Sequence, residues 1–73
     1  MRRKKYIDSR GQKYQVMGGI GPDTYKGRYQ KADRSGSAYW HGIRSLPWRN
    51  TAEEAQADLD QLAAKKGWVE WMD

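Results

Sequence analysis

Residues 49–68, RNTAEEAQADLDQLAAKKGW, decide how the rest of the chain has to fold. Thr51 is a good N-cap and Glu54 stands three residues later, the spacing at which each side chain can satisfy a free backbone N–H of the other residue. Gly67 suits the left-handed position that ends a helix. The segment therefore predicts one helix, with Thr51 before its first turn and Gly67 after its last.

The apolar stripe of this helix is narrow and consists mostly of alanine. Its members recur at spacings of three and four residues: Ala52, Ala55, Leu59, Leu62 and Ala63. Small side chains let a helix lie close to a sheet, whose larger rings then fill the remaining volume. The four Trp and five Tyr of the chain are able to supply that volume.

Three segments before the helix alternate in the manner of strands. The first is KYQVM, which starts at Lys13 and stops at a Gly-rich stretch. The other two, residues 24–32 and 37–45, flank the turn sequence DRSGS and predict a hairpin. We therefore expect an α+β fold in which a three-stranded antiparallel sheet packs on one C-terminal helix, in the order βββα.

The length of the chain limits it to one small domain, which we place at residues 6–73 after a flexible basic arm at residues 1–5. The absence of Cys and the single His exclude disulfides and the usual zinc sites, and we expect no metal or cofactor. The basic start is followed by polar residues and no apolar run is long enough to span a membrane, so we expect a cytoplasmic protein.

Charge is divided unevenly along the chain. Residues 1–51 contain twelve Lys or Arg and three Asp, a net +9, whereas residues 52–73 contain two Lys and six acidic residues, a net −4. A cationic surplus of this size is typical of nucleic-acid binding. If the helix covers the back of the sheet, its acidic side chains are expected to form a solvated face, away from a basic front.

The stretch AYWHGIRSLPWRNTAEEAQADLDQLA resembles the end of the plant ethylene-response-factor type of DNA-binding domain. The matching residues are Trp40, Gly42 and the run TAEEA at residues 51–55. The strand order also resembles the N-terminal arm-binding domains of phage and transposon tyrosine integrases. Both resemblances, over residues 13–66, imply a sheet that enters the DNA major groove and contacts it through Arg and Trp on its open face.

The candidate contacts with nucleic acid follow from that face. They are Lys13, Lys26, Arg28, Arg34, Trp40, Arg44 and Arg49. Alternation places four of them on one face of the hairpin, while Arg34 near the turn and Arg49 near the helix are expected to reach phosphates. The alternative is that Arg28 and Arg44 are merely solvated and that Trp40 is a core ring.

The sequence therefore favours a small monomeric DNA-binding protein, an accessory or regulatory factor of a phage or mobile element. The alternative is a protein-interaction module or small inhibitor that binds an acidic partner through its basic, aromatic sheet. Binding of single-stranded RNA or DNA is a third possibility. An enzyme is not expected, because His41 has no nucleophile or second His in a recognisable motif. Trp48, Trp68 and Trp71 are expected to pack the edges of sheet and helix.

Overall fold

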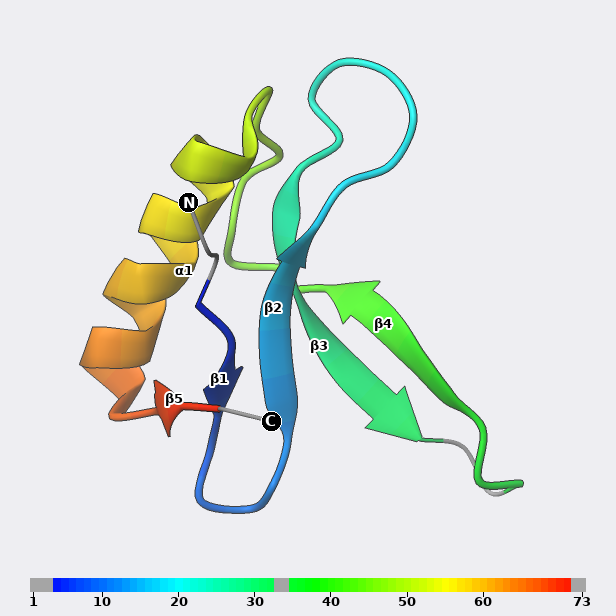
Figure 1. Cartoon of the computed structure of the whole chain (residues 1–73), viewed down its shortest axis with the longest axis vertical. Helices are drawn as coiled ribbons and strands as arrows, with labels where there is room; N and C mark the ends of the chain where they lie inside the picture. Colours follow the sequence, from blue (N-terminus) through cyan, green and yellow to red (C-terminus); the bar gives the residue numbers. More distant parts are fainter. Residues whose placement is uncertain (1–3, 33–34, 72–73) are drawn as a thin grey trace.

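The computed structural model describes residues 4–32 and 35–71 of the chain. Its strands form one antiparallel sheet in the order β4-β3-β2-β1-β5, with a single helix in the described part (Figure 1). In chain order the elements are β1 (Tyr6–Ile7), β2 (Lys13–Met17), β3 (Lys26–Ala32), β4 (Ala38–Gly42), α1 (Ala52–Lys66) and β5 (Val69–Glu70).

The α+β class and the order of β2, β3, β4 and α1 agree with the sequence, but the expectation of three strands is wrong, because the sheet has five. The two additional strands, β1 and β5, are only two residues long. Strands this short show no alternation. β1 pairs with β2 and also with β5, which follows the helix, and this long-range pairing is invisible in a local pattern.

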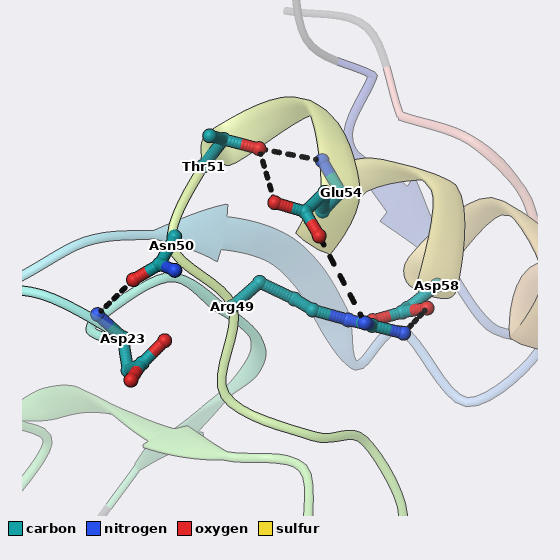
Figure 2. A network of polar contacts seen from close by, with 6 residues as sticks. All are labelled: Asp23, Arg49, Asn50, Thr51, Glu54 and Asp58. Atoms are coloured by element: carbon teal, nitrogen blue, oxygen red, sulfur yellow. Dashed lines mark hydrogen bonds and ion pairs between the residues drawn. The ribbon is translucent and has the colours of Figure 1, made fainter.

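Helix α1 begins and ends where its capping residues predict. The Thr51 hydroxyl accepts the Glu54 N–H at 3.2 Å and donates to the Glu54 carboxylate at 3.0 Å, which departs from the reciprocal backbone bond of a full capping box (Figure 2). Gly67 has a φ of 77°, and its N–H donates to the carbonyl of Ala63 at 2.8 Å. The left-handed Gly67 turns the chain back to the sheet, so that β5 can pair with β1.

The core lies between α1 and strands β2 and β3. Its buried helical residues are Ala55, Leu59 and Ala63, members of the predicted stripe. Gly27, the second residue of β3, leaves room for the core, since a Cβ there would lie 2.7 Å from a methyl of Leu46 and 3.2 Å from one of Leu59 on the helix. The absence of a side chain at Gly27 therefore lets α1 and the segment before it lie close to the sheet.

A row of aromatic rings crosses the helix side of the sheet. Cross-strand pairing aligns Tyr6 with Tyr14, Tyr14 with Tyr29, and Tyr29 with His41. Tyr14 stacks on Trp68, with ring centroids 3.7 Å apart and planes 11° apart. The row is buried at Tyr6 and Tyr14 and becomes exposed at His41, because the β3–β4 hairpin extends away from α1 (Figure 1).

The acidic residues of α1 do not form the expected solvated face. Asp58 accepts two hydrogen bonds from Arg49, and Asp60 accepts a 2.6 Å hydrogen bond from the hydroxyl of Tyr6. Both carboxylates thus bind other parts of the same chain, and only Glu53 and Glu54 of the helix acids are exposed. The acidity of the helix mainly serves to attach it to β1 and to the segment before α1.

Burial also changes the acidity of the tyrosines in the aromatic row. Loss of solvation, followed by the hydrogen bond to Asp60, raises the pKa of Tyr6 to about 12. Loss of solvation, followed by the hydrogen bond to Asp8, raises the pKa of Tyr14 to about 12 as well. Within the described residues, no helix has the length and apolar character needed to cross a membrane.

Candidate nucleic-acid interface

The face of the sheet turned away from α1 is called here the open face. Strand alternation and cross-strand pairing assign to it Ile7, Lys13, Gln15, Met17, Lys26, Arg28, Gln30 and Trp40. The only acidic residue in the described strands is Glu70, which pairs with Tyr6 and so belongs to the helix side. The strands therefore present cations and no carboxylate on the open face.

Three of the predicted contacts, Lys13, Lys26 and Arg28, thus share one face, and Trp40 joins them opposite Gln30. Their separation from the carboxylates of α1 is a consequence of alternation, because the intervening residues of β2 and β3 pack toward the helix. The face is one that a polyanion could approach without meeting strand carboxylates.

A first cluster of cations and indole lies where the segment before α1 joins the sheet. Arg49 pairs with Tyr25 through backbone hydrogen bonds of 2.8 and 3.0 Å, which places the preceding Trp48 beside Lys26. The Lys26 ammonium lies 4.7 Å from the centre of the Trp48 ring, and the Arg28 guanidinium carbon lies 5.4 Å from it. Cation–π attraction therefore holds Trp48 against the open face.

A second cluster lies on the β1–β2 side of the same face. The ammonium groups of Lys5 and Lys13 lie 4.8 and 4.1 Å from the centre of the Trp71 ring. The N–H of Trp71 donates to the carbonyl of Lys5 at 2.7 Å, so the chain after β5 is held beside the start of β1. Each of the two indoles thus has two cations against it.

The predicted cations differ in how accessible they are. Lys26 is 9% exposed, so it contributes charge to the face but little contact area. Arg28 is half-buried, and its Nε is a buried donor without a hydrogen-bond partner. A buried donor without a partner costs free energy, and its burial also keeps a ligand from reaching it. A ligand would therefore contact the rest of the half-buried Arg28 side chain.

The remaining predicted contacts are dispersed. Arg44 is exposed in the turn after β4, and Arg34 lies outside the described residues, as does part of the arm at residues 1–5. Arg49 is occupied by Asp58, with Nε–Oδ2 and Nη2–Oδ1 distances of 2.8 and 3.1 Å, and lies 3.9 Å from Glu54 (Figure 2). Its guanidinium attaches the segment before α1 to the helix, and the structure gives it no free fork for phosphate.

The sequence reading missed the roles of Trp48 and Trp71 and of Lys5. It treated both tryptophans as edge packing, which describes only Trp68 among the three. The positions of Trp48 and Trp71 depend on backbone pairing with Tyr25 and Lys5, distant in sequence.

An open hollow of about 690 Å³ adjoins the first cluster, between the β2–β3 loop and the segment before α1. The residues that line it are Gly19, Ile20, Asp23, Thr24, Arg28 and Trp48. Ile20 is fully exposed and Trp48 is 50% exposed. The hollow thus combines apolar surface, a cation and a carboxylate at one end of the open face.

No protein-family model, curated protein or solved structure matches this chain. The likeness to ethylene-response-factor and integrase N-terminal domains therefore stays a likeness of short motifs, and the five-stranded sheet differs from the three strands that it implied.

Proposed function

We propose that the protein binds duplex DNA through the open face of its sheet. The observation that supports this most is the placement of Lys13, Lys26 and Arg28 on one face whose described strands provide no carboxylate. Elsewhere in the fold the cation Arg49 is neutralised by Asp58, while Lys13, Lys26 and Arg28 lie against indole rings and form no ion pair with an acid among the described residues.

The mechanism is attraction of phosphates followed by contact with the grooves. Lys5, Lys13 and Arg28, together with other cations of the chain such as the exposed Arg44, would neutralise about four to six phosphates, so log K should fall with log salt with a slope of about −3.6 to −5.4. A cation resting on an indole is partly desolvated and oriented before it binds. Trp48 and Trp71 thus serve to position the charges as well as to offer apolar contact with sugars.

Fluorescence anisotropy with a labelled random duplex, measured at several salt concentrations, tests this function. Lys13→Gln removes a cation from the open face, and Lys31→Gln removes one from an exposed position on the opposite face of the neighbouring strand. We expect Lys13→Gln to weaken binding and to reduce the salt slope by about 1. Lys31→Gln should change the slope much less.

The two variants also decide between modes of binding. Equal losses from Lys13→Gln and Lys31→Gln would mean that charge acts without regard to face, which contradicts the proposal. Preference for a single strand over the duplex would favour stacking on the exposed rings instead. Absence of binding to either nucleic acid, at salt low enough for non-specific association, would favour the protein-interaction alternative.

A further inference from the structure

We propose that the hollow between the β2–β3 loop and Trp48 binds one unpaired guanine base. The inference rests on the proposed DNA binding and adds a second feature to its ligand, a guanine at a strand end or in a bulge. It is carried by the chemistry of the four side chains that the hollow brings together: Ile20, Asp23, Arg28 and Trp48.

The apolar part of the hollow suits a flat ring. Ile20 is fully exposed and Trp48 is half-exposed, and both line the same hollow. Large apolar side chains held open to solvent in this way mark a surface that gains from being covered. Any nucleobase offers a π face for such contact, so these two side chains account for binding of a base but not for a choice among bases.

The polar residues of the hollow select guanine among the four bases. The guanidinium of Arg28 donates hydrogen bonds, the carboxylate of Asp23 only accepts them, and both residues line the hollow. Guanine alone among the four DNA bases presents an acceptor pair, O6 and N7, to a guanidinium and a donor pair, N1–H and the N2 amino group, to a carboxylate. A hollow with one group of each kind therefore matches guanine on both of its edges.

The same chemistry requires the base to be unpaired. In a duplex the N1–H of guanine is already bound to cytosine, so a carboxylate cannot form the paired contact with N1–H and the amino group. Only a base at an end, in a bulge or turned out of the stack exposes that edge. The open face would bind the duplex, and the hollow at one end of this face would bind a base that has left the duplex.

The loop that supplies Asp23 is held in place before any ligand arrives. Asp23 adopts a φ of 54°, a left-handed conformation that Asp and Asn tolerate better than most residues. Its N–H donates to the side-chain oxygen of Asn50 at 3.0 Å (Figure 2), and the hydroxyl of Thr24 donates to the carbonyl of Gly21 at 3.0 Å. A loop fixed in this way loses less freedom on binding.

The test compares five labelled duplexes by fluorescence anisotropy: one blunt, and four that differ only in a single bulged G, A, C or T. We expect the bulged G to bind on the order of ten-fold tighter than the other bulges. Asp23→Asn keeps the backbone conformation and removes the paired acceptor, so the preference for G should disappear. Glu53→Gln, an exposed carboxylate on the helix, is the matched control and should keep the preference.

The ratio of affinities for the bulged duplexes is the quantity to compare, because Asp23→Asn also removes one negative charge and will tighten binding to all of them. Equal affinities for the four bulges, with the blunt duplex bound, would overturn the guanine site and leave the DNA-binding proposal standing. Persistence of the preference in Asp23→Asn would likewise overturn the role of that carboxylate. Binding of the bulged G without any binding of the blunt duplex would support the hollow and contradict the proposed role of the open face.

Discussion

Arg49 and Asp58 form a two-point contact that joins the segment before α1 to the middle of the helix, with Nε–Oδ2 and Nη2–Oδ1 distances of 2.8 and 3.1 Å (Figure 2). Asp58 is 16% exposed, so one side of this contact is shielded from water. Because Arg49 also pairs by backbone with Tyr25, the contact connects the helix, the segment before it and the residue that precedes β3. This contact gives Arg49, a predicted DNA contact, a structural role.

Asp58→Asn should lower the melting temperature of the protein. The substitution keeps the size of the side chain but removes the charge and one acceptor of the paired contact, and charge-assisted hydrogen bonds are the stronger kind. The exposed part of the pair is screened by water, so we expect a decrease of roughly 4 to 8 °C. Thermal unfolding followed by circular dichroism measures it, and Glu53→Gln, on an exposed part of the helix, should leave the melting temperature almost unchanged.

Arg49 shows which kind of contact a sequence pattern cannot predict. The helix could be predicted, because the capping contacts of Thr51 and Gly67 lie within a few residues in the chain. The partner of Arg49 stands nine residues away on a different element, and no local pattern pairs the two. An arginine read by itself is equally suited to a phosphate and to a carboxylate of its own chain.

The same limit applies to the sheet and to the open face. The period of two in β3 assigned Lys26 and Arg28 to one face, and the structure agrees with that assignment. Strands β1 and β5 went unpredicted because two residues provide no period and their pairing spans nearly the whole chain. Trp48 and Trp71 reached the open face through other long-range contacts, the backbone pairing of Arg49 with Tyr25 and the hydrogen bond from Trp71 to Lys5. Strand alternation thus predicted that Lys26 and Arg28 lie on one face, while the positions of the rings beside them depended on tertiary contacts.

Gly27→Ala should destabilise the fold more than an ordinary glycine substitution in a strand. The added Cβ would lie 2.7 Å from a methyl of Leu46 and 3.2 Å from one of Leu59, so the core must shift, at a cost of about 1 to 3 kcal/mol. Urea unfolding measures the change. Gly19→Ala is the matched control, because its Cβ would meet Thr24 at an ordinary 3.7 Å.

A second substitution tests the cause of that loss. Shortening Leu46 to Ala removes the clashing methyl, so it should cost less stability in the Gly27→Ala background than in the native chain. If the two substitutions have additive effects, the loss in Gly27→Ala does not come from contact with Leu46.

Tyr6 and Tyr14 should ionise later than an ordinary tyrosine. Each has a pKa raised from 10.0 to about 12, with loss of solvation as the largest cause. A raised pKa in the folded state means that the neutral phenol is favoured there, so its contribution to stability is complete below pH 10 and is lost as the pH rises to about 12. An absorbance titration at alkaline pH should therefore show these two phenols ionising late and together with unfolding.

Asp60→Asn separates the two phenols in that titration. It removes the charged acceptor of the Tyr6 hydroxyl, which lies 2.6 Å away, and leaves the contact of Tyr14 with Asp8 in place. The pKa of Tyr6 should decrease but stay above 10, because loss of solvation, its largest cause, remains, while that of Tyr14 stays raised. An equal decrease for both would show that the variant had loosened the core as a whole.

Arg28→Lys distinguishes the charge of Arg28 from its shape. Lysine keeps the positive charge on the open face, so the salt slope for blunt duplex should not change. Lysine lacks the planar fork of arginine, so the preference for a bulged guanine should decrease.

Arg28→Lys also removes the buried Nε that has no partner, so the stability of the protein should stay equal or rise by up to about 1 kcal/mol. Arg44→Lys, at an exposed turn, should alter neither the preference nor the stability. An unchanged preference for the bulged guanine in Arg28→Lys would contradict the role of the guanidinium in the hollow.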